Sequence, residues 1–388
     1  MKKVLFVALM ATLLVCAFAL IVGAENAYIE AIPEELRFGS DDPAQYFVVF
    51  DGAEYVKVEN DKIYDFDSDK IKAQLDALGV TVGTTHLLKV IFPEEINGTV
   101  IKTVDFNNSI KRNGYFSSCG MVVLPSTMTT VTDMNNNASQ LRAIDFSSTS
   151  GLKELPYLFA GNAEKLRKMY NFPTALDTIA KQAFSGCNGF NGELYVNATT
   201  ILFKAFENGI GLDVTGIVFG PRVTNIDNEA FGTREKPGSK NVKYIEFQND
   251  ITQMSIADSY DNHGSFYFLG GSQRYPYSSL TCIILSNPAQ ADCDGKTFQD
   301  YFPKVYFNEA SKTVGNPVYS THGYGEKAVS YASFFANGTM SATCQRCAKS
   351  ESGTALDPIF KSLGYSCNVA GTPSITFGMK IDYEALDF

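Results

Sequence analysis

A short motif recurs in the middle of this chain and restricts its fold more than any other feature. The pattern Ile-x-x-x-Ala-Phe occupies residues 179–184, 201–206 and 226–231, at intervals of 22 and 25 residues. A second element, a proline followed by two apolar residues three positions apart, occurs at 173–179 and 221–226, and again at 125–131 without a clear Ala-Phe. Self-similarity with a period of about 20–50 residues is typical of repeat proteins whose neighbouring units share one core.

The units also contain short runs in which apolar residues alternate with other residues. These runs lie at 104–106, 122–124, 144–146, 194–196, 217–219, 245–247, 283–285 and 305–307, with a less regular copy at 169–172. Period-two alternation predicts strands with one buried and one open face. A single unit cannot bury its own apolar face, so we expect parallel strands to stack into a ladder with one Phe per unit in the core. The gap after 247 predicts an insertion within the Gly-, Ser- and Tyr-rich segment 258–279.

An all-β sandwich of unrelated strands is the alternative fold, but it does not explain three copies of one motif in near-constant phase. Three segments of the chain match successive parts of a known repeat unit, namely Leu124-Pro125, Val223-Thr-Asn-Ile226 and Ala183-Phe184-Ser-Gly-Cys187. Through them, residues 88–307 resemble the BspA-like bacterial surface leucine-rich repeat family (leucine-rich repeat type 5). The resemblance implies a mainly β fold, an irregular leucine-rich repeat solenoid with a parallel strand ladder. It also implies adhesion to, or recognition of, host proteins, matrix or other cells.

The first 24 residues have the layout of a secretory signal peptide. Lys2 and Lys3 precede an apolar run that ends at Val22-Gly23-Ala24, where small residues suit signal peptidase. A retained membrane anchor is the alternative, because about twenty apolar residues can span a bilayer. We expect cleavage and therefore a protein that is secreted or displayed on the cell surface, with no membrane insertion afterwards. The family resemblance implies that the protein is bacterial.

The two flanks of the repeats differ from them in composition. Residues 25–87 predict a small α+β N-terminal capping region, with a helix at 67–78 that Ser68 or Asp69 caps and Gly79 ends. Residues 308–325 are small and polar and predict a linker. Residues 326–388 predict a small β-rich module with a hairpin that ends in Cys344-x-x-Cys347, and the pattern stops at Phe388 as in a truncated module.

Charge and residue types exclude several functions. Without Lys2 and Lys3 the chain has 30 basic and 42 acidic residues, a formal charge of about −12, which argues against nucleic acid and anionic membranes as partners. The three histidines have no nucleophile motif beside them, and no phosphate-binding glycine loop occurs, so we expect neither catalysis nor a cofactor. The alternatives to a binding protein are a structural cell-surface spacer and, with less support, a carbohydrate-active enzyme.

The Cys-x-x-Cys pair is the one constellation with a chemical spacing. His322, Cys344, Cys347 and Cys367 are weak candidates for a tetrahedral zinc site, and a structural disulfide or unpaired thiols are the alternatives. One such pair without a second pair does not decide between them.

The open side of the strand ladder is the predicted ligand face, for an extracellular protein or glycan. Its candidate residues are the outward ones of the alternating runs: Asp145, Tyr170, Tyr195, Val218, Glu246, Ile284 and Tyr306. Exposed tyrosines beside carboxylates suit both kinds of ligand. The alternative is that this face is merely solvated and that loops make the contacts.

Overall fold

The computed structural model describes part of the chain, and every structural statement below refers to that part. The described residues are 27–107, 109–134, 137–207, 213–231, 241–254, 282–285, 292–293, 296–297, 318–319, 328–331, 338–344, 349–356, 360–368 and 374–381. The predicted leader (1–24) and insertion (258–279) lie outside these ranges.

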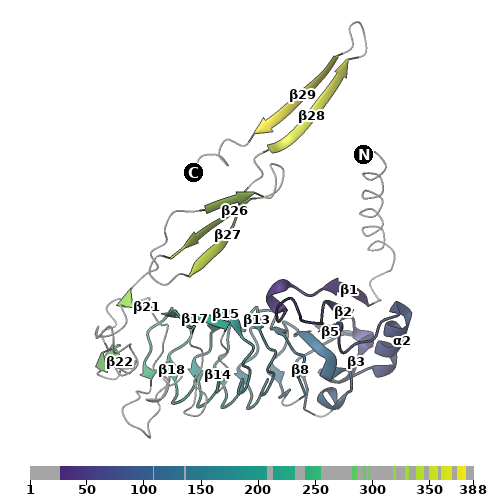
Figure 1. Cartoon of the computed structure of the whole chain (residues 1–388). Coiled ribbons are helices and arrows are strands. Elements are labelled where there is room, and N and C mark those ends of the chain that lie inside the picture. The colour runs from purple at the N-terminus through teal and green to yellow at the C-terminus, as the bar shows by residue number, and fades with distance from the viewer. Residues whose placement is uncertain are drawn as a thin grey trace.

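The described chain is mainly β, and most of its strands belong to two ladders that run along the repeats (Figure 1). The first ladder consists of two sheets, with the strand orders β1-β2-β5-β9-β11-β13 and β15-β17-β19-β21-β24. Its strand pairs are parallel except for the antiparallel β1–β2 pair. Its strands are β1 (Tyr28–Ala31), β2 (Tyr46–Asp51), β5 (His86–Ile91), β9 (Cys119–Val123), β11 (Ala143–Asp145), β13 (Lys168–Tyr170), β15 (Asn191–Val196), β17 (Asp213–Phe219), β19 (Tyr244–Phe247), β21 (Cys282–Leu285) and β24 (Val318–Tyr319). The Asn191 backbone N–H donates to the Arg167 carbonyl at 3.4 Å, which links the two sheets.

The second ladder contains the apolar residues that follow Pro125, Pro173 and Pro221, together with equivalent short strands of the other units. It consists of two sheets. The first has β3 (Val56–Glu59) antiparallel to β4 (Lys62–Phe66), followed by β8 (Thr103–Val104) and β10 (Thr130–Val131). The second has β12 (Glu154–Leu155), β14 (Thr178–Ile179), β16 (Thr200–Ile201), β18 (Asn225–Ile226) and β20 (Gln253–Met254). The prediction that Val104 belongs to the first ladder is wrong, because Val104 pairs with Ile63 and Val131 in the second ladder. In the first ladder it is strand β5, and not a strand at Val104, that pairs with β9.

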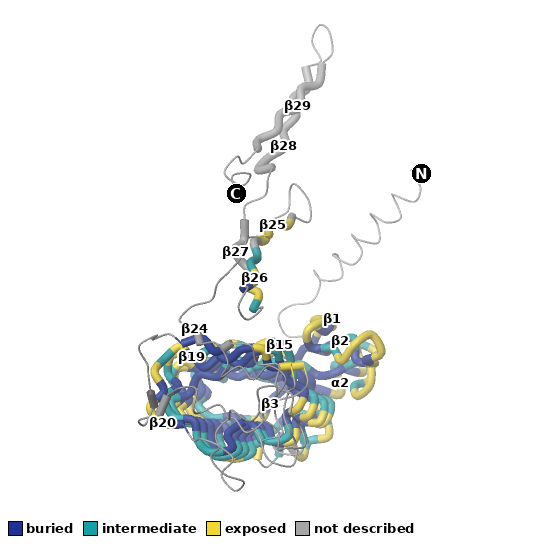
Figure 2. The backbone as a smooth tube through the Cα atoms, turned by 60° about the vertical axis from the view of Figure 1, so that its left-hand side comes forward, coloured by how far each residue is buried: buried dark blue, intermediate teal, exposed yellow. Residues whose placement is uncertain are grey.

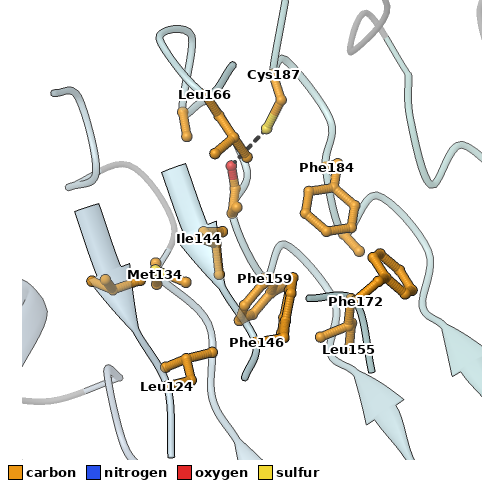
Figure 3. Close-up of a cluster of buried hydrophobic side chains, with 14 of the residues drawn as sticks. Leu124, Met134, Ile144, Phe146, Leu155, Phe159, Leu166, Phe172, Phe184 and Cys187 are labelled. Atoms are coloured by element: carbon orange, nitrogen blue, oxygen red, sulfur yellow. Dashed lines mark hydrogen bonds between the residues drawn. The ribbon is translucent and has the colours of Figure 1, made fainter. Parts of the chain in front are cut away.

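The core lies between the ladders and is lined with phenylalanine. The Phe of each Ala-Phe motif is fully buried, and the Phe184, Phe206 and Phe231 rings stack in series with centroids 5.0 and 4.9 Å apart. The Phe159 ring meets the Phe184 ring edge to face, with centroids 5.8 Å apart, and lies tilted against the Phe146 ring, with centroids 6.0 Å apart (Figure 3). In Figure 2 many residues of both ladders are coloured as buried, as expected for units that share one continuous core.

The region before the repeats continues the first ladder, since β2 pairs with β5 and β5 pairs with β9. Helix α2 (Ser68–Leu78) buries Ile71 and Leu75 and ends at Gly79, whose φ of 67° suits glycine. Its N-cap is Asp67, which accepts a hydrogen bond from the Lys70 N–H, so the predicted caps Ser68 and Asp69 are wrong. The remaining short elements are η1 (Glu34–Leu36), η2 (Ala53–Tyr55), β6 (Glu95–Ile96), β7 (Thr99–Val100), η3 (Ile110–Arg112) and η4 (Phe116–Ser118).

The C-terminal described segments are antiparallel. The predicted hairpin is present as β25 (Ala328–Tyr331) and β26 (Gly338–Thr343), and β27 (Ser350–Leu356) adds a third strand beside β26. Strands β28 (Phe360–Asn368) and β29 (Ser374–Ile381) form a further hairpin, and β22 (Asp292–Cys293) pairs with β23 (Lys296–Thr297).

Candidate binding face

The side of the first ladder that points away from the core is called the outer face here. Strand register places two columns of residues on it, because alternate residues of a strand share one face. One column holds the predicted Asp145, Tyr170, Tyr195, Val218, Glu246 and Ile284, and the other, two residues earlier in each strand, holds Ala143, Lys168, Glu193, Gly216 and Tyr244.

Two separate segments of the chain cover much of this face. Val218 is 1% exposed and Ile284 is 4% exposed, so the prediction that they are open to solvent is wrong. They are buried together with Tyr244 and Cys344. Cys344 follows β26 in the antiparallel pair of β26 and β27, which is called the C-terminal hairpin below. Tyr306 lies outside the described residues.

The N-terminal cover is the segment 32–45, called the arm below. Its Ile32, Leu36 and Ala44 pack against Met121 and Ala143 of the first ladder. Arg142 anchors the arm with a bidentate ion pair to Asp42, in which Nη2 donates to Oδ1 at 2.9 Å, and Nη1 also donates to the Leu36 carbonyl at 3.0 Å. Both charged side chains are buried.

Glu35 fixes the tip of the arm over β13 and β15. Its carboxylate accepts a hydrogen bond from the Tyr170 hydroxyl at 3.2 Å, and its carbonyl accepts from Arg167 Nε at 3.0 Å and Asn191 Nδ2 at 3.1 Å. The Arg167 guanidinium lies 4.6 Å from the centroid of the Phe38 ring. Burial and the neighbouring Glu35 carboxylate raise the pKa of Tyr170, so its hydroxyl stays a donor.

Asp42 makes the attachment of the arm sensitive to acid. Burial raises the pKa of its carboxyl, but hydrogen bonds from Arg142 and from the backbone N–H groups of Phe38 and Ala44 outweigh burial and lower the pKa to about 2. An aspartate whose pKa falls on folding stabilises the folded chain above its unfolded pKa, near 4, and this contribution is lost as pH falls from about 4 to about 2.

We therefore expect the free energy of unfolding to drop by about 2 kcal/mol across this pH window because of Asp42 alone. Urea unfolding of the wild type and of Asp42→Asn at pH 6, 4 and 2.5 measures it. The variant should be less stable at pH 6 and lose less stability on acidification. Asp213→Asn, at an exposed aspartate beside Arg167, is the matched control and should keep the wild-type pH dependence. Parallel curves for wild type and Asp42→Asn would contradict the assignment.

The C-terminal cover centres on Lys349. Its ammonium lies 3.0 Å from a Glu193 carboxylate oxygen and 2.8 Å from one of Glu246, and 5.8 Å from the centroid of the Tyr244 ring. The Tyr244 hydroxyl donates to Glu193 at 2.6 Å. Burial lowers the pKa of Lys349, but the hydrogen bonds from the ammonium to Glu246 and Glu193 outweigh burial, and the pKa is raised.

The middle of the outer face lies between the two covers. Tyr195 is half-buried there, and its ring meets Phe172 edge to face at 6.1 Å. Burial raises the pKa of Tyr195 and lowers that of Lys168, which donates to the Asn191 carbonyl at 2.9 Å. At the end of its strand, Asp145 is occupied by hydrogen bonds from the Ser147 N–H and the Asn171 amide.

Of the four metal-site candidates, only Cys344 has a described side chain. Cys344 is buried among apolar side chains, whereas His322 and Cys347 lie outside the described ranges, as does the side chain of Cys367. Within the described part of the chain, no group of three or more His, Cys, Asp and Glu side chains could hold a metal ion.

Several residues of the face were missed by sequence reasoning. Glu193 and Tyr244 lie two positions before Tyr195 and Glu246, so extending the period-two pattern by one step would have found them. Glu35 and Asp42 gave no signal, since their partners lie 100 residues or more away along the chain. Lys349 likewise meets Glu246 across 103 residues.

Comparison with known proteins agrees with this architecture. A family model described as BspA type leucine rich repeat region matches the chain in six copies, over residues 108–236 and 156–262. No curated protein matches the chain significantly. None of the helices in the described ranges has the length and hydropathy needed to span a bilayer. The matched stretch coincides with both strand ladders from β9 to β20, and the repeat region at residues 108–262 therefore belongs to the BspA-type leucine rich repeat family.

Proposed function

We propose that this chain is a secreted or cell-surface recognition protein that binds an extracellular protein or glycan through the outer face, in adhesion or host interaction, without catalysis. In this proposal residues 1–24 are a cleaved signal peptide of a bacterial protein, 25–87 cap the solenoid formed by 88–307, and 308–325 link it to the module 326–388. A repeat region of the BspA type supports protein recognition at a surface in general terms.

The observation that carries the proposal is the composition of the outer face between its two covers. Tyr195 is half-buried, with its ring packed against Phe172 and against the cluster of Val218, Tyr244 and Ile284. The same strand, β15, carries the Glu193 carboxylate two residues earlier, and Glu193 pairs with Lys349. Asn191 adds a side-chain oxygen that is buried and has no hydrogen-bond partner among the described residues. An aromatic ring fixed by packing among charged groups is the composition of an interface hot spot.

The proposal predicts that Tyr195→Ser weakens binding of the purified chain to its target cells at least about tenfold, equivalent to about 1.4 kcal/mol. Fluorescently labelled protein titrated onto intact host and bacterial cells measures the affinity, and protease or periodate treatment of the cells separates protein from glycan ligands. Thermal unfolding checks that the variant folds.

Tyr157→Ser provides the matched control, because Tyr157 is 55% exposed and follows β12 of the second ladder. It should bind as the wild type does. Equal affinity of the Tyr195→Ser variant and the wild type for every cell type that the chain binds would overturn the placement of the site.

A further inference from the structure

We propose that Glu193, Tyr244 and Glu246 form a receptor site for a lysine side chain, which the chain's own Lys349 occupies until a lysine of a partner protein replaces it. This inference rests on the proposed recognition function and names the chemistry of its partner. It makes the C-terminal hairpin an internal competitor for the outer face.

The site is built by three neighbouring strands of the first ladder. Glu193 of β15, Gly216 of β17 and Tyr244 of β19 lie side by side in register. A Cβ atom at Gly216 would come within 2.1 Å of the Tyr244 ring, so only glycine lets that ring lie across β17. The ring then reaches Glu193, to which its hydroxyl donates at 2.6 Å.

The charges of this site require a cation. Two carboxylates, Glu193 and Glu246, converge on one ammonium at 3.0 and 2.8 Å, and without it they would repel each other. A lysine ammonium is a compact charge with three donors that can serve both carboxylates, and the nearby Tyr244 ring adds an electrostatic attraction. The geometry therefore favours lysine over the planar guanidinium of arginine, which matches a single carboxylate.

The hairpin holds Lys349 in place through a small contact. The Cys344 N–H donates to the Lys349 carbonyl at 2.7 Å, and the Cys344 side chain is buried on Val218, Tyr244 and Ile284. Lys349 is an internal ligand joined to the site by the chain itself, so a partner's lysine must bring further contacts of its own to displace it. The net negative charge of the full sequence, −10, attracts basic partners in general, and Glu193 and Glu246 attract a cation to this site.

The test measures the reactivity of Tyr244 in the full-length chain, by tetranitromethane nitration and peptide-resolved mass spectrometry. Lys349→Ala should raise the nitration rate of Tyr244 about tenfold, which corresponds to about 1.4 kcal/mol for the lost ion pairs. Glu246→Gln should act in the same direction. Lys57→Ala removes an exposed lysine paired with Asp65 and should leave Tyr244 unchanged.

The second arm supplies the lysine from outside. A synthetic peptide of residues 343–352, with serine at both cysteine positions, should restore the protection of Tyr244 in the Lys349→Ala chain. The same peptide with norleucine in place of Lys349 should not. Unchanged nitration in Lys349→Ala, or equal protection by both peptides, would overturn the lysine site. Because no partner is needed, this result is independent of the cell-binding test, and either proposal can fail alone.

Discussion

Replacing Phe206 by alanine is expected to lower the free energy of unfolding by about 3–5 kcal/mol. Phe206 is fully buried, and its ring stacks on Phe184 at 5.0 Å and on Phe231 at 4.9 Å. Deleting it removes apolar burial and leaves a cavity that rings fixed on both sides cannot fill by collapsing. Each of the two neighbouring rings belongs to another repeat, so one substitution weakens two inter-repeat contacts.

Phe203→Ala is the matched control within the same motif. The Phe203 ring is partly exposed and lies between two ammonium groups, those of Lys181 at 5.1 Å and Lys204 at 5.2 Å. Its removal should cost less than about 1 kcal/mol, the size of an exposed cation–π contact. Urea unfolding followed by circular dichroism measures both variants. Equal losses would mean that the stacked phenylalanines do not form the common core of the repeats.

The phenylalanine series also explains how much of the fold the sequence could predict. In a repeat protein each unit contacts its neighbours, so the residues that build the core recur at a readable interval. The motif Ile-x-x-x-Ala-Phe therefore predicted the buried positions of Ile179, Ala183 and Phe184 and their equivalents, which are all fully buried. The alternating runs predicted the first ladder from β9 to β21 for the same reason.

The candidate site could be predicted only in part, because what covers the ladder is not periodic. Tyr170 and Glu246 were assigned to the outer face correctly, since alternation within a strand decides the side. Whether that side is open depends on segments far away in the chain. Val218 is buried by a hairpin more than 100 residues later, and no local pattern at Val218 contains that information.

The arm and the hairpin differ in how strongly they are attached to the outer face. The hairpin is held by Lys349 and its partners Glu246 and Glu193, whose side chains are 14%, 13% and 36% exposed, so these contacts are more open to water than those of the arm. The arm is held by Arg142 and Asp42, whose side chains are 1% and 4% exposed. A buried ion pair contributes little net stability, yet removing one partner leaves an uncompensated charge. Opening of the outer face should therefore occur at the hairpin.

For the arm, we expect the substitution Asp42→Ala to lower the free energy of unfolding by about 3–5 kcal/mol at neutral pH. The Arg142 guanidinium would stay buried without its carboxylate, and its Nε already has no hydrogen-bond partner among the described residues. The double variant Asp42→Ala/Arg142→Met should recover most of the loss, because an apolar side chain of similar length needs no counter-charge.

Asp213→Ala provides the matched control, since it removes the 61%-exposed partner of Arg167 and should cost less than about 1 kcal/mol. Urea unfolding of the four chains, with nitration of Tyr170 as a local probe of the arm, completes the comparison. A double variant as unstable as Asp42→Ala alone would show that arm packing, and not the unpaired charge, causes the loss. If the double variant recovers stability but leaves Tyr170 reactive, the ion pair serves to orient the arm over the outer face, because stability alone does not require it.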